Sequence, residues 1–143
     1  MGINLVQTAL GDFELEGVGG TGFGFLSATV SYHPTSNATN VAFVAPRALR
    51  VKAILGRVQA VGTDGSAVTA TVFKAPSGTA IAAGTALHSG TFNLKGTLST
   101  NQTLTLSTTS ADLDIAAGDT VGVILTGTLT VATGGITISY TPR

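Results

Sequence analysis

Cysteine and tryptophan are absent from this chain of 143 residues, and methionine occurs once. Without cysteine the chain has no disulfide framework and no thiolate ligand for a metal site. It contains no run of 18 apolar residues, so we expect no membrane-spanning helix and no membrane partner. The first residues lack the basic start and the apolar block of a signal peptide, and we therefore expect synthesis in the cytoplasm without export.

Charge is scarce as well. Asp, Glu, Lys and Arg make up 10% of the residues, against roughly 25% in an average soluble domain, and the net charge is zero. Such a surface has little repulsion between molecules and few lysines to protect the edges of a sheet. We therefore expect the surface to be covered by further copies of the chain, by a larger assembly, or by both. A monomer kept soluble by threonine and serine hydroxyls is the alternative.

The residues that are abundant favour β-structure. Hydrophobic residues reach 43%, and 24 threonines with 19 glycines favour strands and tight turns over helices. Segments of alternating apolar and polar residues recur from Leu26 to Tyr140, without a helical pattern or an internal repeat. The sequence therefore predicts an all-β protein: an antiparallel two-sheet β-sandwich, jelly-roll-like, of about eight strands.

Several local patterns refine this prediction. Residues 49–74 indicate a hairpin of two long strands around a polar tip at residues 63–66. Because the parity of the apolar residues changes within the first strand, we expect a bulge near residues 54–56. Gly134-Gly135 favours a second hairpin with a two-residue turn. The weakly patterned residues 75–95 are expected to pack across an edge of the sandwich.

Residues 1–24 differ from the rest of the chain. They hold three of the seven acidic residues, Asp12, Glu14 and Glu16, and they end in a glycine-rich run. We interpret them as an extended N-terminal arm that orders against a partner or a neighbouring subunit, and residues 25–143 as the β-sandwich domain. A frayed terminus is the alternative.

No motif supports catalysis or a bound cofactor. Gly17-x-Gly19-x-x-Gly22 matches the dinucleotide-binding fingerprint as a string, but a strand rather than a helix is predicted after it. A Gly-x-Ser-x-Gly nucleophile elbow is absent. His33 and His88 fall in separate predicted loops, where we expect solvated side chains. The sequence therefore predicts no catalytic residue, no cofactor and no enzyme activity.

Asp112, Asp114 and Asp119 form a cluster of carboxylates. An oxygen-rich turn of this kind can hold calcium, but the spacing matches no EF-hand loop. We favour a turn in which Asp119 accepts hydrogen bonds from backbone amides, as aspartate does in turns generally. The sequence therefore predicts no metal site.

Four of the seven basic residues lie within eleven positions: Arg47, Arg50, Lys52 and Arg57. Alternation along the strand places Arg50 and Lys52 on one outward face. Nucleic acid is a poor partner for them because the chain is neutral and lacks an aromatic stacking platform. An acidic protein surface, including the acidic arm of this same chain, is the better complement.

Six segments carry a resemblance to a known class of protein: residues 43–46, 62–64, 74–80, 92–97 and 116–119, and the Gly134-Gly135 pair. Their pattern over about residues 40–143 resembles small β-sandwich virion proteins of tailed bacteriophages, in particular capsid decoration (cement) proteins and related head-fibre modules. The first 40 residues show no such resemblance.

The resemblance implies a homotrimer that binds the major capsid protein on the outside of the head and links neighbouring capsomers. The protein would then belong to the virion, on the capsid exterior, after synthesis in the host cytoplasm. For contact with the capsid or a sister subunit we expect Phe13, Glu14 and Glu16 in the arm, with Arg50 and Lys52 as a second patch.

A function of another class stays open. Residues 113–123 also resemble the penultimate strand of trimeric jelly rolls such as the complement-C1q and tumour-necrosis-factor-like heads, some of which bind receptors or glycans. The alternative is therefore a trimeric tail or head-fibre module that binds a host-surface receptor or glycan. Sugar sites favour exposed aromatic rings, whereas Tyr32 and Tyr140 are expected on apolar strand faces. An enzyme ranks third, for want of a nucleophile or an acid/base pair.

Overall fold

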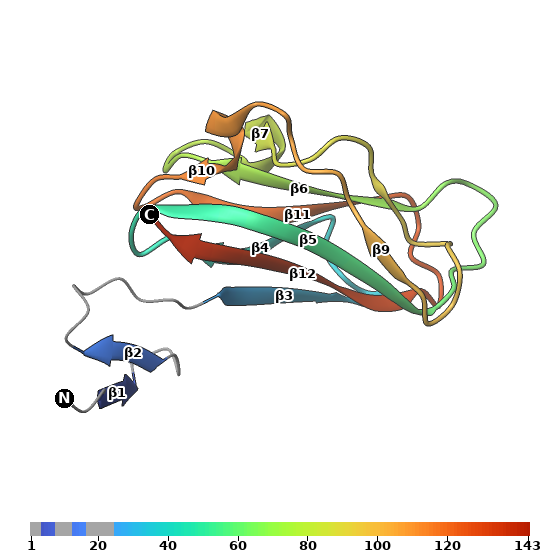
Figure 1. Cartoon of the computed structure of the whole chain (residues 1–143). Coiled ribbons are helices and arrows are strands. Elements are labelled where there is room, and N and C mark those ends of the chain that lie inside the picture. Colours follow the sequence, from blue (N-terminus) through green and yellow to red (C-terminus); the bar gives the residue numbers. More distant parts are fainter. Residues whose placement is uncertain (1–3, 8–12, 17–24) are drawn as a thin grey trace.

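The computed structural model describes residues 4–7, 13–16 and 25–143, and residues 25–143 form two five-stranded antiparallel sheets packed face to face (Figure 1). No α-helix occurs in the described residues; two short 3₁₀ turns, η1 (Ile81–Ala83) and η2 (Ser110–Leu113), lie outside the strands. The predicted all-β sandwich is thereby confirmed. Neither short helix is long or apolar enough to cross a membrane.

The first sheet has the order β3, β12, β5, with two short strands on the far edge of β5. β3 spans Leu26–Tyr32, β12 spans Thr133–Pro142, and β5 spans Leu49–Ala60. The short strands are β10 (Asp114–Ile115) and β9 (Asn101–Thr103).

The second sheet has the order β4, β11, β6, with two short strands on the far edge of β6. β4 spans Thr39–Val44, β11 spans Thr120–Thr126, and β6 spans Thr69–Ala75. The short strands are β7 (Thr85–Ala86) and β8 (Phe92–Asn93).

The long strands β3, β4, β5 and β6 alternate between the two sheets, β11 pairs with β6 in the second sheet, and β12 returns to the first, which is consistent with a jelly roll. The two sheets hold ten strands rather than about eight, because four of them are only two or three residues long.

The core lies between the inner faces of the two sheets. In β11 the alternating residues Val121, Val123 and Leu125 are buried, and in β12 Ile136 and Ile138 are buried opposite them. Burying each such side chain contributes about 1.5 to 3 kcal/mol relative to leaving it in water. The strand pattern read from the sequence is therefore the pattern that fills this core.

The predicted hairpin over residues 49–74 is wrong. β5 pairs with β12, whereas β6 pairs with β11 in the other sheet, and residues 61–68 carry the chain across the end of the sandwich. The buried faces of both strands point into the same core from opposite sides. A strand in either position shows the same alternation, so the pattern does not distinguish a hairpin from a sheet-to-sheet crossing.

Gly134 and Gly135 lie inside β12, so the predicted two-residue turn is also wrong. The reason for glycine at position 134 is close packing: a Cβ atom there would overlap the backbone oxygen of Arg57 and the hydroxyl of Tyr32. The turn before β12 is made by residues 127–132, where Gly127 and Val131 have positive φ angles of 93° and 53°.

The register of β5 against β12 shifts at two places, Lys52 and Gln59, which lie on either side of the predicted bulge. Tyr140 pairs with Val51 and Ser139 with Ala53, so Lys52 has no residue opposite it in β12. At the shift beside Lys52 the buried face of β5 changes from odd-numbered to even-numbered residues, so Ile54 is buried and Leu55 is exposed. The predicted bulge at residues 54–56 is therefore wrong in position.

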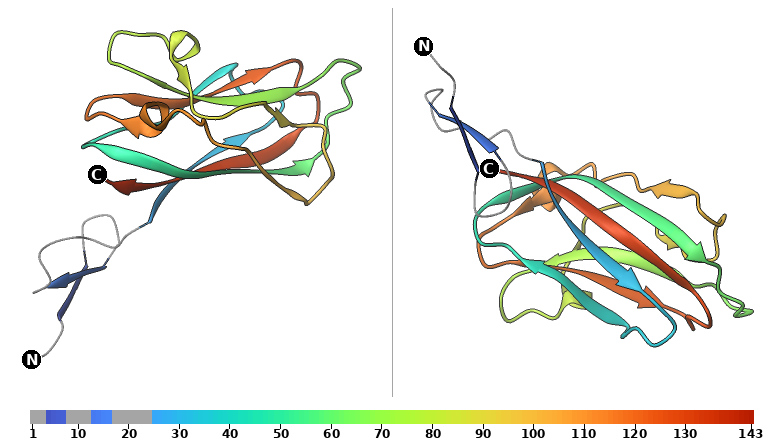
Figure 2. Two further views of the ribbon diagram at one scale, coloured as in Figure 1. Left: turned by 45° about the horizontal axis from the view of Figure 1, so that its top comes forward. Right: turned by 90° about the horizontal axis from the view of Figure 1, so that it is seen from below.

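The two long sides of the sandwich differ. On one side, residues 85–107 cover the edges of β5 and β6, and Leu87, Phe92 and Leu94 are buried there, which confirms the prediction that residues 75–95 pack across an edge. On the other side β3 pairs only with β12, and β4 only with β11, within the described part of the chain. These two edge strands are in contact, and the view from below in Figure 2 presents them.

Within the N-terminal segment, β1 (Asn4–Gln7) and β2 (Phe13–Glu16) pair as antiparallel strands, with Asn4 opposite Glu16 and Gln7 opposite Phe13. This part of the predicted extended arm is thus a two-stranded hairpin in its backbone. Residues 1–3, 8–12 and 17–24 lie outside the described residues, and an arm over residues 1–24 stays a prediction.

Candidate interaction surfaces

The basic residues predicted as a contact patch have different surroundings. Arg50 lies opposite Asp114 of β10, and its Nη1 is 2.9 Å from Asp114 Oδ1. Arg143 Nη1 lies 3.0 Å from the other oxygen, Oδ2, of the same carboxylate. Lys52 is exposed at the bulge. Lys52 forms no ion pair within the described part of the chain, whereas Arg50 already belongs to an ion-pair cluster of the sandwich.

The predicted contact residues Phe13, Glu14 and Glu16 belong to β2, which the structure describes as backbone only. Their side chains lie outside the described residues. A contact role for these three residues, as for Arg50 and Lys52, stays a prediction.

The carboxylates of the predicted cluster serve three separate structural contacts. Asp119 Oδ2 accepts a 3.0 Å hydrogen bond from the Ala116 N–H, which confirms the predicted turn role. Asp112 Oδ2 accepts a hydrogen bond from the Ser107 hydroxyl at 2.5 Å, and Asp114 pairs with arginine. Among the described residues no group of three or more His, Cys, Asp or Glu is placed to hold a metal ion.

The two histidines differ in exposure. His33 is exposed, as expected, but His88 is buried with 6% of its surface accessible, so the prediction of a solvated loop side chain is wrong for it. Its Nε2 accepts a 2.8 Å hydrogen bond from the Val72 N–H of β6. Burial lowers the pKa of His88. His88 is therefore a structural residue that closes the edge of β6 between β7 and β8.

The open side of the sandwich carries exposed apolar residues without charge. Residues 25–46, which include β3 and β4, contain no Asp, Glu, Lys or Arg. Phe25, Val41 and Val44 are 73%, 59% and 57% exposed. Uncharged edge strands with exposed apolar side chains are prone to pair with or pack against another chain. This side is therefore a candidate interaction surface.

A groove opens at the end of this side and is lined by residues at the start of β3 and near the end of β12. These two strand ends lie near the C-terminus in Figure 1. We call this groove the end groove; its volume is about 230 Å³, and its lining residues are Leu26, Phe43, Val44, Pro46, Arg47, Leu49 and Tyr140.

The floor of the end groove includes two aromatic rings from opposite sheets: the centroids of Phe43 and Tyr140 are 4.7 Å apart. Partial burial raises the pKa of Tyr140. Arg47 is exposed and forms no ion pair with any described residue. The groove thus offers an apolar floor and, at Arg47, a positive charge that no described residue pairs with.

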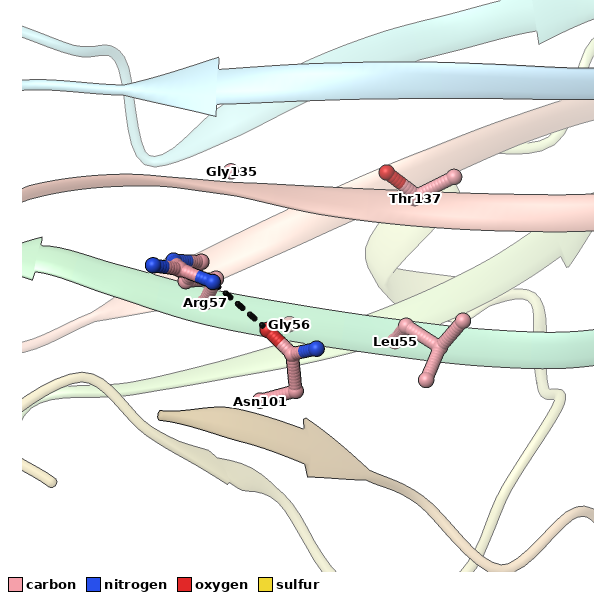
Figure 3. A pocket seen from close by; sticks show the side chains of 6 residues that line it. All are labelled: Leu55, Gly56, Arg57, Asn101, Gly135 and Thr137. Atoms are coloured by element: carbon pink, nitrogen blue, oxygen red, sulfur yellow. Dashed lines mark hydrogen bonds between the residues drawn. The ribbon is translucent and has the colours of Figure 1, made fainter. Parts of the chain in front are cut away.

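A second depression lies on the outer face of the first sheet, above β5, β9 and β12 (Figure 3). Gly135 has no side chain to fill it, and Arg57 and Asn101 border it with a long 3.4 Å hydrogen bond between them. Its rim combines Leu55 with hydroxyl and amide groups, without an aromatic ring. It is therefore a weak candidate for a sugar-binding site, because such sites usually include an exposed aromatic ring.

Sequence reasoning missed the end groove because its lining residues come from three separated segments of the chain. One signal was present: the 22 consecutive residues from 25 to 46 lack acidic and basic side chains. The sequence does not show where on the surface this uncharged stretch lies, whereas the structure places its strands, β3 and β4, on the open side.

No protein-family model matches the chain, and no curated protein matches it in sequence. Among solved structures, the fold is similar to a chain in the capsid of Ralstonia phage GP4, with 14% identity, a TM-score of 0.57, and coverage of 85% of this chain and 86% of that one. It is also similar to a chain in the capsid asymmetric unit of cyanophage Pam1, with 15% identity, a TM-score of 0.50, and coverage of 87% and 90%. At these identities the likeness concerns the fold: the sandwich of this protein is an architecture that is also present in two phage capsids.

Proposed function

We propose that this chain is a structural virion protein of a tailed phage that binds the outer surface of the capsid. In this proposal a homotrimer contacts the major capsid protein and links neighbouring capsomers. The observation that carries the proposal is the jelly-roll sandwich, which is similar over 85% or more of this chain to chains of two phage capsids. The open, uncharged side of the sandwich supports it further, because such a side needs a cover.

The mechanism is physical linkage. Packaged DNA pushes capsomers apart, and a rigid protein bound to several of them raises the free energy of their separation. A trimer binds with three copies of each contact, so weak individual contacts add up through a high effective concentration. Stable protein–protein interfaces bury about 1,200 to 2,000 Å² in total. In this proposal the exposed edge strands and the N-terminal hairpin together provide that area.

The proposal assigns no catalytic step. The described residues offer a buried His88 whose Nε2 is already occupied by the Val72 N–H, and carboxylates engaged with arginine, serine and a turn amide. These contacts stabilise the fold, and the proposed role requires only a rigid fold with surfaces for its partners.

Co-sedimentation with purified capsids that lack the protein tests this function. We expect saturable binding and capsids that release DNA at a higher temperature. Replacement of Phe13 and Glu14 by alanine should weaken binding without lowering the melting temperature of the protein. Binding to host cells with no binding to capsids would contradict the proposal and favour the receptor- or glycan-binding fibre module.

A further inference from the structure

The charge of this neutral chain is divided unequally between its two parts. Residues 25–143 carry all seven basic residues and four of the seven acidic ones, a net charge of +3. Residues 1–24 carry the other three acidic residues and no basic one, a net charge of −3. The N-terminal segment and the sandwich are therefore electrostatically complementary.

The end groove is placed to receive an acidic strand with apolar residues. Its floor is apolar, through Phe43 and Tyr140, and Arg47 at its rim has no ionic partner among the described residues. β2 has the sequence Phe13-Glu14-Leu15-Glu16, in which apolar and acidic residues alternate. An extended strand of this pattern has one apolar face that can pack on the floor of the groove, and its acidic residues bring negative charge near Arg47.

The hairpin also needs a cover of its own. A two-stranded antiparallel sheet is at best marginally stable in water, because it has no second layer against which to bury its apolar residues. β1 and β2 form such a pair. The segment joins the sandwich at Phe25, which is 73% exposed and precedes Leu26 of the groove lining, so the chain enters the sandwich beside the end groove.

We propose that the end groove of one copy binds the β1–β2 hairpin of a second copy. Each copy then gives one hairpin and receives one, a head-to-tail contact that closes into a ring when the rotation between copies permits. This inference rests on the self-association in the proposed function, but not on the binding of a capsid. It assigns the acidic N-terminal segment a role in linking subunits, so replacement of Phe13 and Glu14 weakens capsid binding by reducing the number of linked copies.

The absence of cysteine permits a direct test by disulfide capture. Two full-length chains, one with Phe13→Cys and one with Val44→Cys, are co-expressed with tags of different mass and oxidised. We expect a covalent product of one chain of each kind, because docking of the hairpin brings position 13 close to position 44. A disulfide forms only when the two Cα atoms lie within about 7 Å of each other. The matched control replaces Val44→Cys by Val131→Cys, since Val131 is 52% exposed and lies in the turn at the opposite end of β12. Equal yields with both partners, or no mixed product, would overturn the proposal.

Two further variants make the result specific. Arg47→Glu should lower the yield of the mixed product several-fold, and Glu14→Arg with Glu16→Arg on the other chain should restore it. A chain with both Phe13→Cys and Val44→Cys that closes only within itself would show that the hairpin occupies its own groove and would overturn exchange between copies. Melting temperatures of all variants confirm that they fold.

The solution mass separates this inference from the proposed function. A trimer without disulfide capture overturns the groove contact alone and leaves the trimer to another interface. A monomer overturns the homotrimer of the proposed function as well. Capsid binding is measured independently in the sedimentation experiment.

Discussion

The Val72 N–H of β6 donates a 2.8 Å hydrogen bond to Nε2 of His88, which is buried. β7 and β8 pair with β6 on either side of this point, so the imidazole takes the place of a strand carbonyl in the gap between them. Nε2 accepts this bond only when it carries no proton. The edge of β6 therefore depends on the protonation state of one side chain.

Acidification should destabilise the fold through His88. Its pKa in the folded state lies below the ordinary value of 6.5, because burial disfavours the charged ring. The unfolded chain therefore takes up the proton first as the pH falls below about 6.5, and stability is lost from there down to the folded pKa. Urea unfolding at pH 8 and at pH 5 measures the loss. His88→Gln should reduce the difference between the two, whereas His33→Gln should leave it unchanged; equal behaviour of both variants would contradict the prediction.

The Tyr32 hydroxyl should reduce stability at high pH. This oxygen is buried and has no hydrogen-bond partner within the described residues, and burial raises its pKa from 10.0 to about 12. The unfolded chain therefore loses the proton first, and stability falls as the pH rises from 10 toward 12. Tyr32→Phe should remove this component and leave the free energy of unfolding at pH 7 unchanged or about 1 kcal/mol higher. A loss of more than about 1 kcal/mol at pH 7 would mean that the hydroxyl makes a favourable contact.

Gly134→Ala should destabilise the sandwich strongly. The added methyl group would overlap the backbone oxygen of Arg57 and the ring of Tyr32, so β12 must shift away from its neighbours. Overpacking of this kind costs about 1 to 3 kcal/mol. Gly65→Ala is the matched control, because nothing lies within 4 Å of a Cβ atom there. Thermal unfolding of both variants measures the difference, and equal melting temperatures would rule out the steric explanation.

Asp114→Asn should lower stability by a small, salt-dependent amount. The carboxylate pairs with both Arg50 and Arg143, and all three side chains are partly exposed. Exposed ion pairs contribute about 0 to 1 kcal/mol each and weaken as salt screens them. Unfolding at low and at high salt should show a loss that shrinks with added salt. A loss that persists in high salt would assign the effect to packing rather than to charge.

The core strand β11 and the uncharged residues 25–46 differ in how much of their role can be predicted from the sequence. The alternation of Val121, Val123 and Leu125 identified a strand and its buried face, because that alternation is a local property of extended backbone. The lack of charge over residues 25–46 was visible in the sequence, but its position on one open side was not.

Side-chain roles that depend on distant neighbours escaped the sequence. His88 lies in a connection that looked solvated, and its burial depends on the gap that β7 and β8 leave along β6. Gly134 looked like a turn residue, and its role follows from the approach of Arg57 and Tyr32, which are more than seventy positions away in the chain.

The amino-acid sequence by itself determined the class of this protein: strands rather than helices, a turn organised by Asp119, and a chain without thiols. The tertiary structure alone decided which strands pair, since β5 and β6 face each other across the core instead of forming a hairpin. The physical reason is that strand periodicity has a range of a few residues, whereas pairing is decided by the burial of whole faces. The end groove depends on this long-range pairing, because its lining residues come from strands of both sheets.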